Sequence, residues 1–272
     1  MAKSRIALLP IYYLVLLVLL YIPIGVLFLF SVNDGVVLAF PLKGLTTHWY
    51  QDMFGNTELM RALANSALVA FSSSVMATTL GTAAAIALVR FNFGGKGAFL
   101  AVALMPLLVP FLILGVALLI LFSALGVPRS LVTVGIAHTI ISLPYTLLIM
   151  MSRLVGFDPN LEEAAYDLGA TYPYILRRVI IPLIAPAILA AWLVAFTVSF
   201  DEFVLASFLN GGRATLPVYI FGQLRFANRF PQVVALAVVV MVISIALFIV
   251  SERLQRIGIQ ASENRRLGRV TP

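Results

Sequence analysis

Six long apolar blocks constrain the fold of this chain more than any other feature of its sequence. Each block is long enough, at about 1.5 Å of helix per residue, to cross a hydrocarbon layer of about 30 Å. In lipid, one segment satisfies its own backbone hydrogen bonds only as a helix. Only 11% of the 272 residues are charged and the mean hydropathy is +1.06, which excludes an ordinary soluble domain. The sequence therefore predicts one all-α membrane domain over residues 1–272, with transmembrane helices near residues 6–32, 63–89, 99–125, 131–151, 183–208 and 233–250.

The distribution of basic residues predicts the orientation of the chain. The net charge is +7, and most Lys and Arg residues flank the apolar blocks, which favours a topology signal over a nucleic-acid partner. With both termini in the cytoplasm, twelve basic residues lie inside and six outside, as the positive-inside rule requires. The six outer ones are Lys43, Arg61, Arg129, Arg213, Arg225 and Arg229.

The two ends of the chain fit the same orientation. Lys3 and Arg5 precede a first block that is too long for the apolar core of a secretory signal, so we expect a retained anchor. The basic tail 251–272 is expected to be a lipid-headgroup or orientation signal and not a regulatory domain. There is no cysteine, which excludes disulfides and thiolate chemistry.

A polar segment over residues 153–182 interrupts this apolar pattern with the sequence "EEAAYDLGATYPYILRRVIIP" from Glu162 onwards. The orientation above places it in the cytoplasm. Asn160 is expected to cap a short helix that starts with two acidic residues and continues with two alanines. Gly169 is expected to take the left-handed conformation and turn the chain. A second short helix over residues 171–178 is expected to follow, and it carries Tyr172 and Tyr174.

The spacing in this segment closely resembles the EAA signature of bacterial ABC importer permeases. That pattern is EAA, three residues, Gly, nine residues and Ile-x-Leu-Pro, and here Glu163-Ala164-Ala165 is followed at the right distances by Gly169 and by "VIIP" at residues 179–182. Val179 and Ile181 depart from the pattern but remain apolar. The resemblance implies a type I ABC importer permease fold in the bacterial cytoplasmic membrane.

In that family the segment is a coupling helix that docks on a separate cytoplasmic ATPase. The resemblance thus implies that Glu163 makes a polar contact with the ATPase, that the two alanines allow close packing, and that Gly169 sets the turn. It also implies two ATPase subunits, a second permease of a different chain, and an external solute-binding protein that delivers a small solute for alternating access. The expected ATPase-coupling residues are Glu163, Ala164, Ala165, Gly169, Tyr172, Tyr174 and Arg177.

The chain shows no site for ATP hydrolysis. In the candidate phosphate loop "RFNFGGKGAF", Arg90 stands where the first Gly is needed and Gly97 where the hydroxyl is needed. The common enzyme motifs are also missing. We therefore expect no cofactor in this chain, with ATP and Mg bound by the partner ATPases, and a transport role without covalent chemistry.

Other stretches look like the second permease of spermidine/putrescine-type importers, and they suggest a polyamine or similar cationic solute. They are "GLTTHWYQDMF" from Gly44, "HTIISLPYTLLIM" from His138 and "SFDEFVLASFLNGGRATLPVYIFGQLR" from Ser199. The last holds Asp201 and Glu202 within an apolar block, where acidic residues are costly and indicate function. One of these carboxylates could instead close a structural hydrogen bond or an ion pair with Arg213, Arg225 or another subunit. Carboxylates and aromatic faces suit ammonium groups, so the expected substrate path comprises Asp201, Glu202, Phe200, Trp192 and Tyr145, with Phe203 as a further aromatic face.

Two other functions compete with the importer. An ion-gradient-driven transporter or channel could use the acidic pair as a protonation site, but it does not account for the EAA spacing. An intramembrane enzyme could use Ser199, Asp201 or His138, but it needs a nucleophile beside a base, and the sequence does not place His138 beside Ser199. A histidine hydrogen-bonded between packed helices is the simpler expectation, and no metal site is expected.

Overall fold

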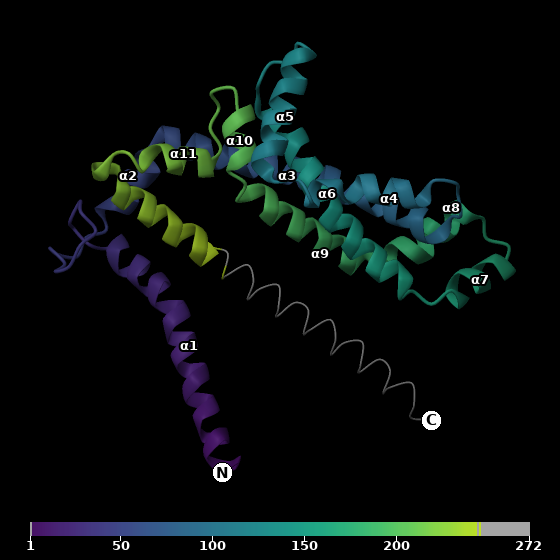
Figure 1. The fold of residues 1–272 in the computed structure, drawn as a ribbon, viewed down its shortest axis with the longest axis horizontal. Coiled ribbons are helices and arrows are strands. Elements are labelled where there is room, and N and C mark those ends of the chain that lie inside the picture. The colour runs from purple at the N-terminus through teal and green to yellow at the C-terminus, as the bar shows by residue number, and fades with distance from the viewer. Residues whose placement is uncertain (1, 244, 246–272) are drawn as a thin grey trace. The chain divides into compact units, whose positions relative to one another are not determined.

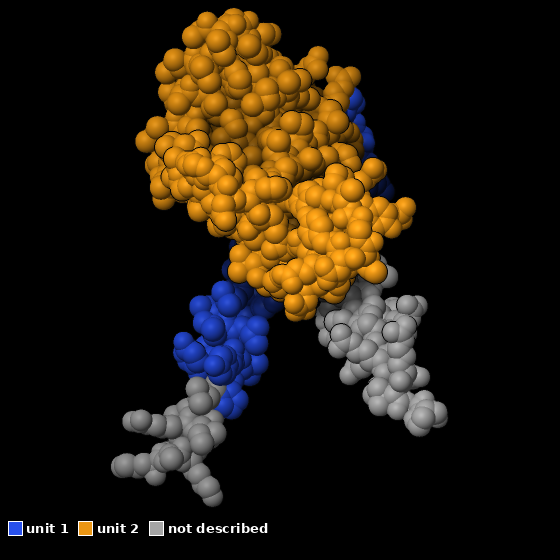
Figure 2. All heavy atoms as spheres, turned by 90° about the vertical axis from the view of Figure 1, so that its right-hand side faces the viewer, with its two compact units in different colours: residues 1–57, 222–272 blue, residues 58–221 orange. Residues whose placement is uncertain are grey.

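The computed structural model describes residues 2–243 and 245, which form helices joined by loops (Figure 1). Within these residues there is no β-strand, only one isolated bridge between Asn33 and Leu45. The predicted all-α fold is confirmed. The chain divides into two compact units, residues 58–221 and residues 1–57 with 222–272 (Figure 2). One membrane domain over the whole chain stays a prediction.

Three long helices form the centre of the unit over residues 58–221. They are α3 (Thr57–Arg90), α6 (Leu131–Val155) and α9 (Ile181–Phe200), and α6 packs along α9. α3 and α6 come close at Gly81, where an added Cβ would meet Thr146, and the Thr146 hydroxyl donates to the Ala77 carbonyl at 2.8 Å. Small residues let backbones approach in this way where lipid provides no hydrophobic drive between helices.

Two apolar clusters fill this unit. One surrounds the ends of α3, α6 and α9 near the polar segment and includes Leu88, Leu154, Ile175 and Ile180. The other joins α3 and α6 to α5 (Phe111–Ala124) and α10 (Val204–Leu209), and its buried members include Val69, Leu118, Phe122, Val134, Ile141 and Leu205.

The third predicted helix, over residues 99–125, is wrong as a single element. It is replaced by α4 (Lys96–Leu104), a 3-10 turn at Met105–Leu107, and α5, with a bend of 106° between the two arms. Pro106 lies in the turn and Pro110 directly precedes α5. Proline removes a backbone donor and pushes the preceding residue out of the helical region, so two prolines four residues apart end the helix.

The fifth predicted helix, over residues 183–208, is also interrupted. α9 ends at Phe200, residues 201–203 form a break, and α10 follows. At its other end the helix begins earlier than expected, because α8 (Tyr172–Ile175) and a π-helical turn at Leu176–Ile180 join it in one apolar helix from Tyr172 to Phe200. The second, short helix of the polar segment is therefore an extension of a long membrane helix.

The other unit contains α1 (Ala2–Ser31), α2 (His48–Gly55), a 3-10 turn at Ala227–Arg229 and a helix at Phe230–Ile243. α11 (Leu216–Gln223) leads into it from the first unit. Asn33 organises the loop after α1, since its carbonyl accepts from the Trp49 indole at 2.8 Å and its side chain accepts from the Lys43 amide at 3.1 Å. Trp49 is buried here.

The described residues contain four helices that are long and apolar enough to cross a membrane, or five if the bent pair of α4 and α5 is one span. The predicted sixth helix, over residues 233–250, is described only to residue 243 and at 245, and the basic tail 251–272 lies outside the described residues. Six spans therefore remain a prediction.

Candidate functional site

The polar segment folds as two helices around a sharp turn. Two residues after the end of α7 (Asn160–Asp167), Gly169 has a φ of +79°, the left-handed conformation that the sequence predicts. The Gly169 amide donates to the Tyr166 carbonyl at 2.8 Å and the Ala170 amide donates to the Ala165 carbonyl at 3.1 Å. These two bonds form a Schellman motif, in which the last carbonyls of a helix are satisfied by the residues that turn away from it.

The start of α7 differs from the prediction. Asn160 is the first residue of the helix and not its cap. The carboxylate of Asp158 instead accepts the Asn160 amide at 3.1 Å. An aspartate at a turn often accepts the backbone amide of the residue two positions later in this way.

The predicted coupling residues mostly lie on the outside of this segment. Glu163, Ala164, Gly169, Tyr174 and Arg177 are exposed, whereas Ala165 and Tyr172 are half-buried. Ala165 packs against the apolar cluster at the ends of α3, α6 and α9. The structure thus divides the two alanines, since Ala164 is free for a partner and Ala165 holds α7 to the rest of the chain.

The most exposed apolar side chain of the segment was not predicted from the sequence. Leu168, between α7 and Gly169, is 89% exposed, and Tyr166 is 48% exposed. Together with Glu163 and Ala164 these residues form what we call the coupling surface. An exposed leucine outside the apolar blocks, next to a turn, was the available signal. Large exposed apolar side chains on a polar segment favour contact with another protein.

The two acidic residues at the break after α9 lie in opposite surroundings. Asp201 is exposed, whereas Glu202 is only 6% exposed. The Glu202 carboxylate accepts the backbone amides of Leu205 at 2.9 Å and Ala206 at 3.0 Å, so it caps α10. Glu202 is therefore a structural residue, and neither Arg213 nor Arg225 is its partner.

Glu202, in the break after α9, also ends a buried polar chain that joins the three helices α3, α9 and α6. The Ser73 hydroxyl donates to the Ser199 oxygen at 2.8 Å, Ser199 lies 2.7 Å from Nδ1 of His138, and Nε2 of His138 lies 3.1 Å from the Glu202 carboxylate. All four side chains are buried. With the proton of His138 on Nε2, the Ser73 hydroxyl donates to Ser199, the Ser199 hydroxyl donates to Nδ1 of the ring, and Nε2 donates to Glu202. Buried polar groups that are fully paired in this way fix the register of packed helices.

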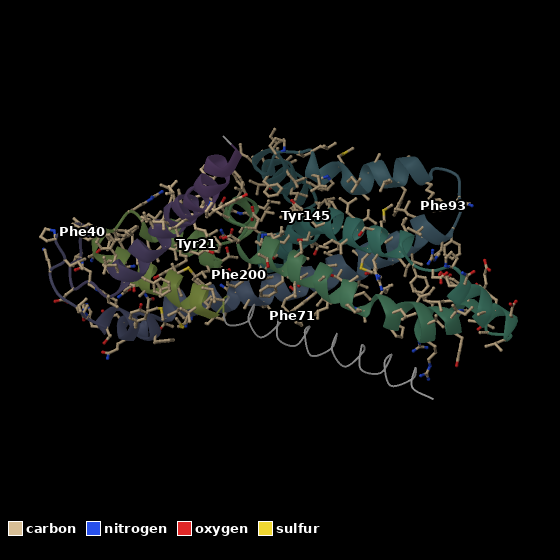
Figure 3. All side chains as sticks on the ribbon, turned by 90° about the horizontal axis from the view of Figure 1, so that it is seen from below. Tyr21, Phe40, Phe71, Phe93, Tyr145 and Phe200 are labelled. Carbon is tan, nitrogen blue, oxygen red and sulfur yellow. The ribbon has the colours of Figure 1, made fainter. Side chains whose placement is uncertain are left out.

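An aromatic column runs along α9 toward Asp201. Trp192, Phe196 and Phe200 follow one another at intervals of four residues, with ring centroids 5.7 and 5.8 Å apart. Phe71 of α3, which is labelled with Phe200 in Figure 3, meets Trp192 edge to face with the ring centroids 6.0 Å apart. Side chains four residues apart share one face of a helix, so the spacing of Phe196 was the signal that the sequence analysis missed. Tyr145 is half-buried on α6, and Phe203 instead contacts Phe221 at 4.7 Å.

Comparisons with known proteins identify the family. Residues 77–257 match the family of inner membrane components of binding-protein-dependent transport systems. The chain belongs to this family of importer permeases. It is 38% identical over 239 residues to the spermidine/putrescine transport system permease protein PotC of Haemophilus influenzae, covering 87% of this chain and 92% of that protein. It is 37% identical over 230 residues to the putrescine transport system permease protein PotI of Escherichia coli, covering 82% of this chain and 81% of that protein.

The fold agrees with this family. A crystal structure of a bacterial ABC transporter involved in the import of the acidic polysaccharide alginate contains a chain that matches with a TM-score of 0.69 at 18% identity, covering 93% of this chain and 95% of that chain. The permease is therefore a multi-pass inner membrane protein with the fold of an ABC importer subunit. It is a transport component and not itself an enzyme.

The structure nevertheless brings together the groups that the enzyme hypothesis needed. The permease places Ser199 beside His138, which the sequence alone could not establish, and His138 beside an acidic residue. Ser199 is 3% exposed and also accepts from Ser73, and Glu202 is occupied by two backbone amides. A nucleophile needs access to a substrate carbonyl, which this burial denies. The arrangement serves helix packing.

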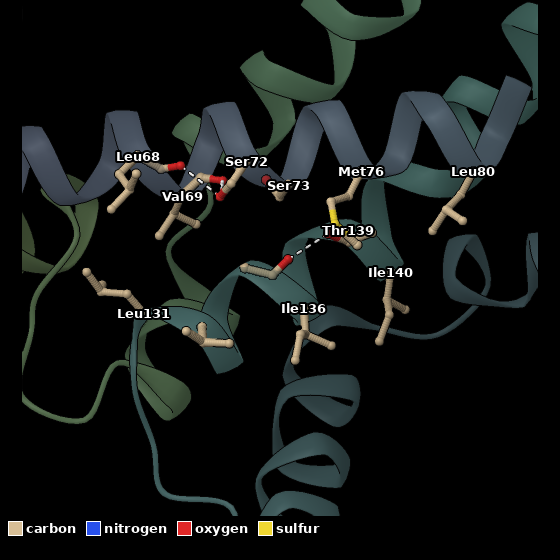
Figure 4. A pocket seen from close by; sticks show the side chains of 12 residues that line it. Leu68, Val69, Ser72, Ser73, Met76, Leu80, Leu131, Ile136, Thr139 and Ile140 are labelled. Atoms are coloured by element: carbon tan, nitrogen blue, oxygen red, sulfur yellow. Dashed lines mark hydrogen bonds between the residues drawn. The ribbon is translucent and has the colours of Figure 1, made fainter.

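A groove of about 580 Å³ lies between α3 and α6 of the permease (Figure 4). Its lining is mostly apolar, and its polar members are Ser72, Ser73 and Thr139. The hydroxyls of Ser72 and Thr139 donate to carbonyls four residues earlier on their own helices, at 2.8 Å each. Hydroxyls used in this way present an apolar surface, so the groove suits lipid tails or an apolar helix better than a charged solute.

Proposed function

We propose that this permease is one of two membrane subunits of an ATP-driven importer for polyamines or similar organic cations, and that its coupling surface docks on a cytoplasmic ATPase. The carrying observation is the polar segment itself. It presents Glu163, Ala164 and Leu168 outward on one side of a Schellman turn at Gly169. The exposed side chains are one large apolar group, one acidic group and the small methyl of alanine. Such a surface fits a groove on another protein, because the alanine lets the partner approach the backbone closely.

In this proposal, movement of the docked ATPase is transmitted along the continuous helix from Tyr172 to Phe200. α8 continues through its π-helical turn into α9, so a displacement of the coupling segment is carried into a membrane helix without a flexible joint. ATP and Mg belong to the ATPase in this proposal, and two ATPase subunits serve the two permeases. Alternating access follows from closing and opening the pair of coupling segments.

The proposed substrate class follows from the other end of α9. Asp201 is exposed at the end of the aromatic column of Trp192, Phe196 and Phe200. A carboxylate attracts an ammonium group by charge, and aromatic faces attract the same group through their quadrupoles. Polyamines carry several ammonium groups separated by methylenes, which suits alternating charged and aromatic contacts. The names of the two permease relatives point to the same class.

The remaining partners complete this proposal. An external solute-binding protein delivers the cation, a second permease of a different chain forms the other half of the path, and lipids surround six spans. Both termini lie in the cytoplasm, which places the coupling surface on the side of the ATPase. This side agrees with the excess of Lys and Arg in the segments assigned to the cytoplasm.

The docking proposal is tested by affinity purification of the permease from the membranes of its own cells in mild detergent. A Gly169→Trp variant and a Gly97→Trp control are purified beside the parent. Gly169 has a positive φ, whereas Gly97 lies in the first turn of α4 with no atom within 4 Å of an added Cβ, so only the tryptophan at position 169 distorts a turn. An ATPase that accompanies the parent and the control but not Gly169→Trp supports the proposal. A parent that arrives folded without any ATPase overturns it.

The substrate proposal is tested by uptake of radiolabelled putrescine and spermidine into proteoliposomes that hold the complete importer. ATP-dependent uptake of either cation, competed by the other, is the expected result. Uptake that needs an ion gradient and not ATP contradicts the proposed mechanism, and ATP-dependent uptake of an uncharged solute alone contradicts the proposed substrate class.

A further inference from the structure

The last residue of α3, Arg90, is paired with a residue of α7. Nη2 of Arg90 lies 2.6 Å from Oε1 of Glu162, and the two side chains are only 17% and 13% exposed. Glu162 directly precedes Glu163 of the EAA signature, and it is not among the coupling residues expected from the sequence. Ion pairs on an open surface contribute little, but a pair withdrawn from water leaves an uncompensated charge when one member is removed.

The surroundings of Arg90 show that α3 holds both helices of the polar segment. The Arg90 guanidinium lies 5.5 Å from the centre of the Phe157 ring, just ahead of α7. The next residue, Phe91, meets Tyr172 of α8 edge to face at 5.5 Å. Two consecutive residues at the end of α3 therefore contact the two arms of the turn at Gly169.

The same helix reaches the proposed solute path. α3 contributes Ser73 to the buried polar chain through Ser199, and Phe71 to the aromatic column through Trp192. A rigid helix with one end attached to the coupling segment and a middle part attached to α9 provides a second mechanical route beside the continuous α8 and α9. Coupling between distant sites travels through such packed elements when both ends are held.

We propose that Arg90 and Glu162 form a joint that makes α3 move with the coupling segment. Arg90 is then a positioning residue for transport. This rests on the proposed docking of an ATPase, since without docking the joint has nothing to transmit. The planar guanidinium suits this task because it fixes the direction of the pair, which the flexible ammonium of a lysine does not.

The test uses the complete importer in proteoliposomes, with ATP hydrolysis and cation uptake measured on the same samples. The single variants Arg90→Glu and Glu162→Arg are compared with the double variant that exchanges the two charges, and with Arg90→Lys. Arg61→Glu reverses an exposed charge at the other end of α3 and serves as the control. Binding of the ATPase and thermal unfolding of each purified complex are recorded first.

Each single reversal is expected to lower the uptake per ATP hydrolysed about tenfold while the ATPase stays bound. The double variant is expected to recover at least a third of the parent ratio, Arg90→Lys to fall between, and Arg61→Glu to match the parent. A double variant as defective as the singles, or single variants with the parent ratio, overturns the joint. If a single variant does not fold, the double variant alone decides, since restored uptake supports the joint and lost uptake in a folded complex overturns it. Failure of the docking proposal itself is distinguishable, because then the parent complex carries no ATPase at all.

Discussion

Asp201 and Glu202 are adjacent in the chain and lie in opposite surroundings, the first exposed and the second 6% exposed beside His138. The break between α9 and α10 produces this difference, because two successive residues leave the helix in different directions. The Glu202 carboxylate accepts two backbone amides at the start of α10 and lies beside His138, whereas the Asp201 carboxylate is exposed. The proposal therefore gives the two acidic residues separate roles, with Glu202 in helix packing and Asp201 in the solute path.

Replacing Glu202 with Gln is expected to destabilise the permease by about 1–3 kcal/mol, since only one oxygen remains to accept and an NH₂ group is brought against backbone donors. Thermal unfolding of the purified protein in detergent measures this. Asp201→Asn is the matched control and should change stability by less than about 0.5 kcal/mol. Equal losses of stability in the two variants would contradict the assignment of Glu202 as the structural residue.

Asp201→Asn should instead show its effect in transport. We expect polyamine uptake by the intact importer to fall about tenfold, which corresponds to about 1.4 kcal/mol of lost attraction for one ammonium group. Asp201→Glu keeps the charge and should retain a substantial part of the uptake. Normal uptake with Asp201→Asn would remove this residue from the solute path.

Gly169→Ala should cost about 1 kcal/mol of stability, because alanine pays for a positive φ that glycine adopts freely. An added Cβ meets no atom within 4 Å, so the cost is conformational and not steric. Gly169→Asn is expected to cost less, since asparagine tolerates this conformation. The control is Gly97→Ala, whose φ is not in the left-handed range, and it should be neutral or stabilising in the same unfolding measurement. A harmless Gly169→Ala would mean that the turn adapts.

The parts of the site that sequence predicts well are those fixed by neighbours in the chain. The turn at Gly169 follows from a helix that must end and a residue without a Cβ, and the EAA spacing is read directly. The bend between α4 and α5 was also within reach, since Pro106 and Pro110 stand in the middle of the predicted helix. The prediction of a single helix over residues 99–125 rested on the length of the apolar block and did not take these prolines into account.

The parts that sequence could not predict depend on residues that are distant in the chain. Arg90 finds Glu162 only because α3 ends beside α7, and His138 finds Ser199 only because α6 packs along α9. Nothing local distinguishes Glu162 from Glu163, or Glu202 from Asp201. Their roles are decided by which side of a helix faces a neighbour, and boundaries uncertain by a few residues cannot specify that side.

Leu168→Ala is expected to weaken binding of the ATPase about tenfold or more while the stability of the permease changes by less than about 0.5 kcal/mol. The reason is that Leu168 is 89% exposed and so contributes contacts only to a partner. Leu108→Ala is the matched control, because Leu108 is 84% exposed but lies at the bend between α4 and α5. Co-purification of the ATPase at increasing detergent concentration measures the difference. Equal retention by both variants would show that Leu168 does not belong to the docking surface.

Two glycines on facing helices provide a test of how closely α3 and α6 pack. An added Cβ at Gly81 would collide with Thr146, whereas an added Cβ at Gly135 of α6 meets nothing within 4 Å. Both glycines lie inside helices, so replacement by alanine improves helix propensity by about 1 kcal/mol at each position. The difference in stability between the two variants therefore measures the cost of the steric contact between α3 and α6. Gly81→Ala should be destabilised by about 1–3 kcal/mol relative to Gly135→Ala in thermal unfolding, because α3 and α6 must separate.

Gly135 lines the groove between the same helices. If an apolar helix of the second permease fills that groove, Gly135→Ala will be harmless in the isolated chain and will weaken the assembled pair, whereas lipid tails will accommodate the added methyl in both.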